Sequence, residues 1–281
     1  MTARVASGSR HWRDPSPLGL AACAALAIVT LFVLVYPAIY VLIGSFRPNG
    51  GLLSAASTLT LRNYIQIFQS GFGRFIFNSL VICVTATLAS TILSIMAAYV
   101  FSRFDFPLKR SFFIGILFGQ VFPWIVLINP LFVAFAAMHL INSYVGMILT
   151  YTAFTIPFSI YMLVGYLVTV PKSLDEAAIV DGASRWQVMW FIICPVMLPG
   201  FVATATYAFL LCWTEFLFAL AFLTQTNLKT LTLGLYQFFG EDNVDWGAVM
   251  AASVVTTLPV FLLFLPIQGR ISPGRTAGAV K

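Results

Sequence analysis

Charged residues are scarce in this chain of 281 residues. Asp, Glu, Lys and Arg together make up 9% of the sequence, whereas hydrophobic residues make up 60%. Soluble domains carry about 25% charged residues, and these cover the surface that faces water. Because so few charges cannot cover a soluble surface, the composition predicts an integral membrane protein.

Histidine and cysteine are also scarce, and catalytic motifs are absent. The two histidines are too few for an HExxH site, and neither a GxSxG motif nor the Gly-Lys dipeptide of a phosphate-binding loop occurs. The four cysteines form no CxxC pair, so we interpret them as small hydrophobic residues rather than as disulfides or metal ligands. The sequence therefore predicts no catalytic residue, no metal site and no cofactor: His11, His139, Cys23, Cys83, Cys194 and Cys212 serve none of these purposes.

Long gaps between charged residues locate the membrane spans. A helix needs about 20 apolar residues to cross the hydrocarbon core. The gap between Arg110 and Lys172 contains 61 uncharged residues, enough for two helices joined at the polar segment 139–143. The first apolar run is too long for the ~7–15-residue core of a cleaved signal peptide, so we expect a retained helix. The predicted fold is an all-α polytopic bundle with six spans, at roughly 18–46, 75–101, 111–138, 143–169, 198–223 and 248–268.

The distribution of basic residues gives the orientation. The net charge is +6, but the basic residues flank the apolar runs, which is typical of membrane topology rather than of nucleic-acid binding. With both termini inside, eleven of the fifteen Lys and Arg residues are cytoplasmic: Arg4, Arg10, Arg13, Arg103, Lys109, Arg110, Lys172, Arg185, Arg270, Arg275 and Lys281. Because Lys and Arg collect on the cytoplasmic side, we expect cytoplasmic tails at 1–17 and 269–281 around a transmembrane domain at 18–268.

The cytoplasmic segment 170–197, bounded by prolines, predicts a helical hairpin. Residues 173–176 and 184–187 both have the form of a capping box, in which a Ser and a Glu or Gln cap the same helix start. Gly182, between them, is suited to the left-handed conformation that ends a helix. Such a hairpin is either a connector on the membrane surface or a knob that docks in a partner's groove. The shape alone leaves both open.

A longer motif in this segment indicates a family. Glu-Ala-Ala, three residues, Gly, nine residues, Ile, one residue and then Cys-Pro closely resembles the EAA loop of ABC importer permeases, with Cys194 in the place of the usual Leu. Runs similar to family patterns also begin and end the second span and occur in the fifth. The C-terminal residues are similar to those of the carbohydrate-type subgroup, which includes maltose-type sugar permeases. These matching segments are 78–80, 97–103, 213–216 and 277–281.

The resemblance implies a multi-pass permease in the cytoplasmic (inner) membrane of a prokaryote. It would form half of the pathway for a sugar or sugar-like solute delivered by an extracytoplasmic solute-binding protein. Its other partners would be a second homologous permease and two ATP-binding subunits, which hold ATP and Mg, so this chain itself would not be an enzyme. The implied ATPase-coupling residues are Glu176, Ala177, Ala178, Asp181, Gly182, Ile192 and Pro195.

Polar residues inside the spans are candidates for the solute path. Glu215 lies in the fifth apolar run, and a carboxylate there should face the bundle interior or water because lipid exposure is costly. It either lines the path beside Trp213 or makes a hydrogen bond that fixes helix packing. The same two interpretations apply to Asn78, Gln120 and Asn129.

Prolines inside the third and fourth spans predict kinks there, at Pro123, Pro130 and Pro157. Two alternative functions remain. One is an ABC importer for a non-sugar solute. The other is an ion-coupled secondary transporter, which would need acidic residues within the membrane, and only Glu215 qualifies.

Overall fold

The computed structural model describes residues 17–48, 59–121, 123–239 and 244–271, and these are helical almost throughout. Within them, four helices are long and apolar enough to cross a membrane, and two sharply bent helix pairs raise the number to six. The predicted all-α membrane bundle is confirmed. The four long helices are α1 (Pro17–Ser45), α3 (Phe72–Arg103), α6 (Tyr144–Val168) and α13 (Trp246–Ile271). The predicted tails lie largely outside the described residues.

The third predicted span is not one straight helix. It consists of α4 (Lys109–Val121) and α5 (Trp124–Ala137), which meet at an angle of 93°. Pro123 has an extended backbone with ψ of 108° and, as a proline, has no N–H to continue a helical ladder. The kink predicted at Pro123 is confirmed, and it divides the predicted span over 111–138 into two helices.

The fifth predicted span is also interrupted. Helix α10 (Leu198–Thr214) ends at Glu215, whose φ of −68° and ψ of 136° are extended, and the short helix α11 (Leu217–Phe222) follows. The prediction of one helix over 198–223 is therefore wrong. The apolar composition of this run continues through the break, so hydropathy alone does not reveal it.

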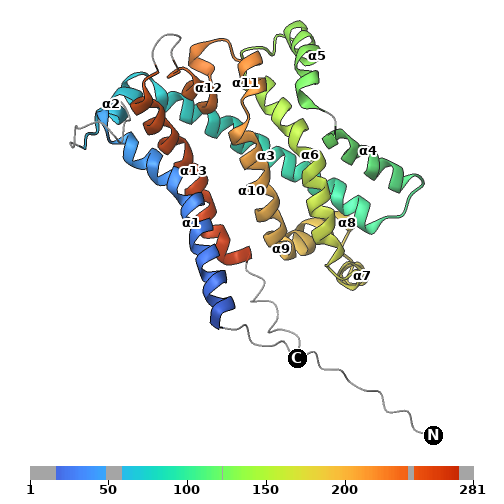
Figure 1. Ribbon diagram of the computed structural model, residues 1–281. Coiled ribbons are helices and arrows are strands. Elements are labelled where there is room, and N and C mark those ends of the chain that lie inside the picture. The colour runs from blue at the N-terminus through green and yellow to red at the C-terminus, as the bar shows by residue number, and fades with distance from the viewer. Residues whose placement is uncertain (1–16, 49–58, 122, 240–243, 272–281) are drawn as a thin grey trace.

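The buried side chains form two clusters along the bundle. One cluster, called the outer core below, includes Phe72, Tyr151 and Trp213. The other, called the inner core, includes Tyr99 and Val188. Helix α3 supplies residues to both clusters and packs along α6 and α10. Figure 1 shows these three helices in the middle of the molecule, with α1 and α13 paired at one side.

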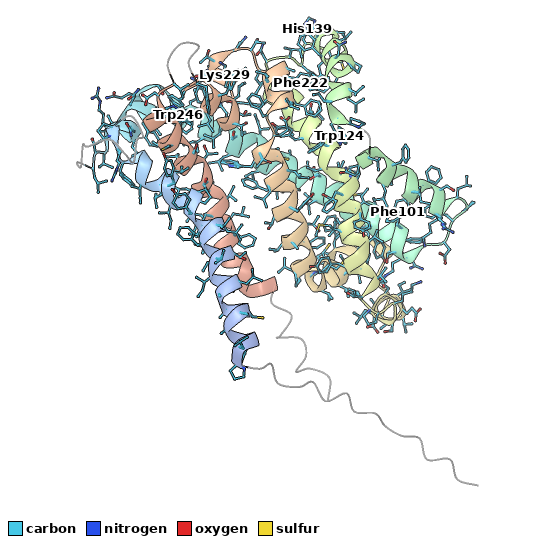
Figure 2. The ribbon with its side chains drawn as sticks, viewed as in Figure 1. Phe101, Trp124, His139, Phe222, Lys229 and Trp246 are labelled. Carbon is cyan, nitrogen blue, oxygen red and sulfur yellow. The ribbon has the colours of Figure 1, made fainter. Side chains whose placement is uncertain are left out.

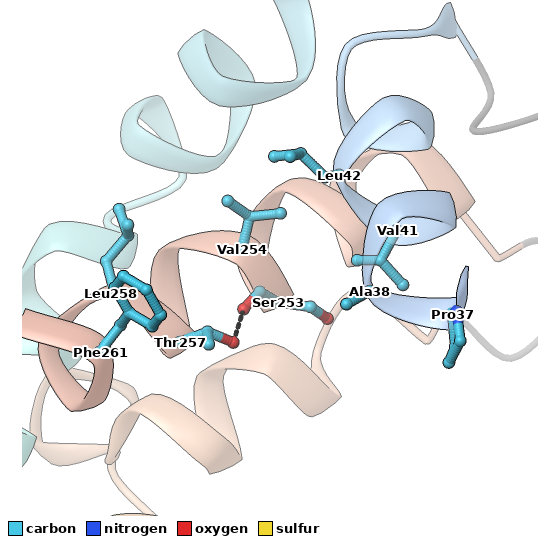
Figure 3. Close-up of a pocket in the computed structure, with 9 residues that line it drawn as sticks. All are labelled: Pro37, Ala38, Val41, Leu42, Ser253, Val254, Thr257, Leu258 and Phe261. Atoms are coloured by element: carbon cyan, nitrogen blue, oxygen red, sulfur yellow. Dashed lines mark hydrogen bonds between the residues drawn. The ribbon is translucent and has the colours of Figure 1, made fainter. Parts of the chain in front are cut away.

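Helix α1 buries almost none of its surface within this chain. Only Gly44 and Ser45 are buried among its residues. An apolar groove of about 470 Å³ runs between α1 and α13 and includes Leu42, Val254 and Phe261 in its lining (Figure 3). Its hydroxyls are already occupied, because Ser253 donates to the Val249 carbonyl and Thr257 to the Ser253 carbonyl. This surface suits lipid or another membrane helix rather than a polar solute.

An even number of membrane crossings requires that the first helix starts and the last helix ends on the same side of the membrane. Figure 1 shows the start of α1, the end of α13 and the hairpin helix α7 (Ser173–Val180) at one end of the molecule. The opposite end carries α2 (Arg62–Gln69) and α12 (Leu231–Tyr236). The end with α7 is called the inner end below, and the other the outer end.

Candidate functional site

The inner hairpin, residues 170–197, has the predicted two-arm form. Its first arm is α7, and its second arm is helical from Arg185 to Val196. Ser184 accepts a hydrogen bond from the Gln187 N–H at 3.3 Å, and the Gln187 side chain accepts from the Ser184 N–H at 2.8 Å. This capping box is confirmed. The second arm comprises α8 (Arg185–Gln187), a π-helical segment (Val188–Ile193) and α9 (Cys194–Val196).

The capping box predicted at 173–176 is wrong. Helix α7 already includes Ser173, and its N-cap Lys172 has a helical backbone without a side-chain cap. The first turn closes through the backbone, since the Leu174 N–H donates to the Pro171 carbonyl and the Glu176 N–H to the Lys172 carbonyl. The helical turn therefore starts before Ser173, which leaves its hydroxyl without a capping position.

Gly182 ends α7 in the left-handed conformation that the sequence predicts. Its φ is +92°, and a Cβ built on it would meet no atom within 4 Å. The Ala183 N–H donates to the Ala178 carbonyl and the Gly182 N–H to the Ile179 carbonyl. These two bonds form a Schellman motif, which satisfies helix-end carbonyls and requires a left-handed residue at this position. The direction of the second arm is thus set at one glycine.

The predicted coupling residues divide between two faces of the hairpin. The small residue Ala178 packs into the inner core, and Ile192 is half-buried against it. The others are exposed: Glu176, Ala177, Asp181, Gly182 and Pro195. Two large apolar side chains share this exposure, since Val180 is 86% and Trp186 57% accessible. The exposed part therefore offers acidic and apolar groups around a tight turn.

A buried ionic group holds the hairpin against the bundle. The Arg103 Nε lies 2.7 Å from an oxygen of Asp175, and both side chains are about 5% exposed or less. The Tyr99 hydroxyl donates to the other Asp175 oxygen at 3.2 Å. The remaining Arg103 nitrogens donate to the carbonyls of Leu167 and Val170, at the end of α6. We call Tyr99, Arg103 and Asp175 the inner anchor.

Glu215 lies in the break between α10 and α11. Its carboxylate accepts hydrogen bonds from the backbone N–H groups of Phe218 at 2.8 Å and Ala219 at 3.2 Å. It also accepts from the Tyr151 hydroxyl of α6 at 2.9 Å. A carboxylate at a helix start satisfies otherwise unpaired N–H groups and complements the positive end of the helix dipole. Glu215 is thus the cap of α11 and a link to α6.

Asn78 and Trp213 have their polar groups engaged within the chain. The Asn78 amide donates to the carbonyls of Asn227 and Lys229 and accepts from the Tyr144 hydroxyl. The Trp213 indole N–H donates to the Thr256 carbonyl at 3.1 Å. Both side chains are buried. These contacts favour the packing interpretation for these two residues.

Gln120 and Asn129 are placed differently. Gln120 is half-buried in α4, and its amide makes a long contact of 3.4 Å with the Phe154 carbonyl. Asn129 is exposed on α5, beyond the 93° bend. The five candidates for the solute path therefore do not converge on one surface within the described residues.

Comparison with known proteins identifies the family. Residues 90–276 match the family model described as "Binding-protein-dependent transport system inner membrane component". A diacetylchitobiose uptake system permease protein, NgcG, of Streptomyces coelicolor is 33% identical over 92% of this chain and 87% of its own length. The trehalose/maltose transport system permease protein MalG of Thermococcus litoralis is 34% identical over 91% of this chain and 94% of its own.

The chain belongs to this family. It is therefore an inner membrane permease subunit of a binding-protein-dependent ABC importer, a transport component rather than an enzyme. The ion-coupled secondary transporter is set aside by this membership. The permease also shares its fold with a chain of a bacterial ABC transporter involved in the import of the acidic polysaccharide alginate. That match has a TM-score of 0.77 and 20% identity, and it covers 91% of this chain and 96% of the other.

The inner anchor is the part of the permease that sequence reasoning missed. In the sequence, Arg103 is one of the cytoplasmic basic residues and ends the family-like segment 97–103, and Asp175 lies inside the predicted capping box 173–176. A signal was present, because opposite charges were placed at the inner ends of the second and fourth spans. Nothing in the local pattern pairs them, since they are separated by more than 70 positions in the sequence.

Proposed function

We propose that this permease forms half of the translocation pathway for a sugar or sugar-like solute. An extracytoplasmic binding protein delivers the solute, a second homologous permease completes the pathway, and two ATP-binding subunits supply the energy. The support for the solute class comes from relatives whose names specify diacetylchitobiose, trehalose or maltose, two of which are 33% and 34% identical over most of their length.

We also propose that the inner hairpin docks on an ATP-binding subunit. The observation that carries this proposal is the turn at Gly182. Its two arms pack into the inner core, while Glu176, Ala177 and Asp181 remain exposed around it. Small residues let a helix sit deep in a partner's groove, and exposed Val180 and Trp186 supply apolar contact area.

Among the candidates for the solute path, Glu215 is the residue to test. Its carboxylate already accepts three hydrogen bonds but is only half-buried, which leaves acceptor capacity for a sugar hydroxyl. Glu215→Gln keeps the shape and one carbonyl acceptor but removes the charge. The path role predicts a raised KM for uptake. Uptake with unchanged KM and rate would assign Glu215 to helix capping alone.

The solute class is tested by uptake in proteoliposomes that contain the permease, its partner subunits and the binding protein. Maltose, trehalose and diacetylchitobiose are the three probes. ATP-dependent uptake of at least one supports the proposal. If none is taken up or competes, while a polyamine or a phosphate ester is taken up, the ABC importer assignment stands and the sugar assignment fails.

A further inference from the structure

Helix α3 differs from α1, α5, α6 and α13 in having no proline. Proline lies inside α1, α5, α6 and α13, at Pro37, Pro130, Pro157 and Pro259. Helix α3 contains no proline in its 32 residues, and its single glycine, Gly73, lies in the first turn. Because kinks arise at prolines and at interruptions of the hydrogen-bond ladder, α3 is an unbroken rod of about 48 Å at 1.5 Å per residue.

The outer end of α3 is fixed to an outer loop by buried side chains. Asn78 donates to the carbonyls of Asn227 and Lys229 at 3.0 and 2.9 Å, and Ser79 accepts from the Leu231 N–H at 2.7 Å. We call Asn78 and Ser79 the outer anchor. Figure 2 shows Lys229 at the outer end of the bundle, opposite the hairpin.

The inner end of α3 is fixed to the hairpin by the inner anchor. Arg103 is in the last turn of α3, where its charge also complements the negative end of the helix dipole. Its ion pair reaches Asp175 in α7, and Tyr99, one turn earlier in α3, holds the second Asp175 oxygen. A further contact comes from Arg185 of the second arm, whose guanidinium lies 5.2 Å from the centre of the Phe104 ring.

The inner anchor fixes the orientation of α7 relative to α3, which apolar packing alone does not do. The Arg103 guanidinium is planar with its nitrogens in fixed positions: Nε lies 2.7 Å from an Asp175 oxygen, and the two terminal nitrogens donate to the carbonyls of Leu167 and Val170. If α7 rotated or slid along α3, the buried carboxylate would lose its counter-charge in a low-dielectric site, which is strongly unfavourable. The hairpin must therefore move together with the inner end of α3.

We infer that the inner anchor is a positioning device that makes the hairpin, α3 and the outer loop 227–231 move as one body. Nucleotide-driven movement of the ATP-binding subunits, applied at the hairpin, then reaches the outer loop along α3. This inference rests on the proposed docking of the hairpin. It goes beyond that proposal because it assigns the transmitting helix and the residues that fasten its two ends.

The experiment uses the purified complex of the permease with its partner subunits. The parent carries Cys23→Ser, which removes an exposed thiol, and Thr226→Cys, which places one at the exposed position directly before the outer loop 227–231. The rate of labelling at position 226 by a maleimide is measured by peptide mass, with and without a non-hydrolysable ATP analogue and Mg. Coupling between distant sites typically changes such an equilibrium by 5–150-fold, so a nucleotide effect of about fivefold or more is expected in the parent.

Asp175→Asn removes the charge with little change in shape and should reduce the nucleotide effect to less than about twofold, although the complex still binds nucleotide. Arg103→Met should act in the same way, and the double variant should be no worse than either single one, because the pair works as a unit. The control is Asp105→Asn, which breaks the exposed Lys109–Asp105 pair in the neighbouring inner loop and should keep the full effect.

If Asp175→Asn does not accumulate, Tyr99→Phe decides, because it deletes one hydrogen bond without a change in volume. It should reduce the nucleotide effect at least about twofold. A full nucleotide effect in either folded variant overturns the inference. A parent complex in which nucleotide does not change the labelling rate at position 226 also overturns the inference. A parent that purifies without ATP-binding subunits instead overturns the proposed function on which the inference rests.

Discussion

Substitutions at Gly182 separate the effect of side-chain size from that of backbone strain, because Asn is larger than Ala but tolerates a positive φ better. Its φ of +92° is unfavourable for residues with a Cβ, but the space around that position is empty. The cost of a substitution is therefore torsional, about 1–2 kcal/mol for an ordinary L-residue, and it is greatest for a β-branched one. Asn tolerates this region better than Ala does. The expected order of hairpin function is Gly, Asn, Ala and then Val.

The magnitude follows from linkage between turn formation and docking. If docking requires the Schellman turn, a cost of 1–2 kcal/mol weakens the affinity of the ATP-binding subunit by roughly 5–30-fold, since 1.4 kcal/mol corresponds to tenfold. The assay is the Kd of the purified ATP-binding subunit for the permease in detergent, with the membrane yield as a check on insertion. Gly165→Ala is the control, because Gly165 also has an empty surrounding but an ordinary backbone.

Two results would refute this reasoning. Gly182→Ala binding better than Gly182→Asn would mean that size, and not φ, governs the site. A wild-type Kd for Gly182→Val would mean that the left-handed turn is not needed for docking at all.

Three further substitutions test the packing that surrounds these sites, each by thermal unfolding in detergent. Asp175→Asn leaves Arg103 buried without a counter-charge and should destabilise the permease by about 3–5 kcal/mol. Glu215→Ala removes the cap of α11 and leaves a buried hydroxyl on α6 without its acceptor, at a cost of about 1–3 kcal/mol. Gly234→Ala places a methyl group against the Phe75 ring and should cost about 1–3 kcal/mol through overpacking.

Matched controls separate these causes from general fragility. Asp105→Asn removes an acid of the same kind whose side chain is 94% exposed, and should leave the unfolding temperature unchanged. Gly115→Ala adds a methyl group where a Cβ meets nothing within 4 Å, and should leave stability equal or higher. Destabilisation by either control equal to that of its partner variant would contradict the structural explanation.

Hydropathy predicted where the bundle crosses the membrane but not where its helices break. The apolar runs that form α1, α3, α6 and α13 were located to within a few residues. A run of that length satisfies its backbone hydrogen bonds in lipid by forming a helix. The break at Glu215 was not predicted, because it depends on local hydrogen bonds between the Glu215 carboxylate and the backbone N–H groups that follow it. The carboxylate caps α11 only when the backbone before it turns extended, and composition does not encode that choice.

The candidate site shows the same division. The turn at Gly182 and the Ser184–Gln187 capping box follow from residues within five positions of each other, so the sequence was sufficient. The inner anchor joins Arg103 to Asp175 across the three helices α4, α5 and α6, and no local pattern specifies such a pair. Packing of α3 against α6 brings them together, and that packing becomes visible only in three dimensions.

The most direct test of the permease's role is purification of its natural complex. An N-terminal tag leaves the C-terminus free, and gentle extraction from native membranes is followed by identification of the bound proteins. Recovery of an ATP-binding subunit and a second permease with the wild type, with the ATP-binding subunit depleted in Gly182→Val, is the predicted result. A permease that inserts normally and purifies alone, or a Gly182→Val variant that retains its ATP-binding subunit in full, would contradict coupling through the inner hairpin.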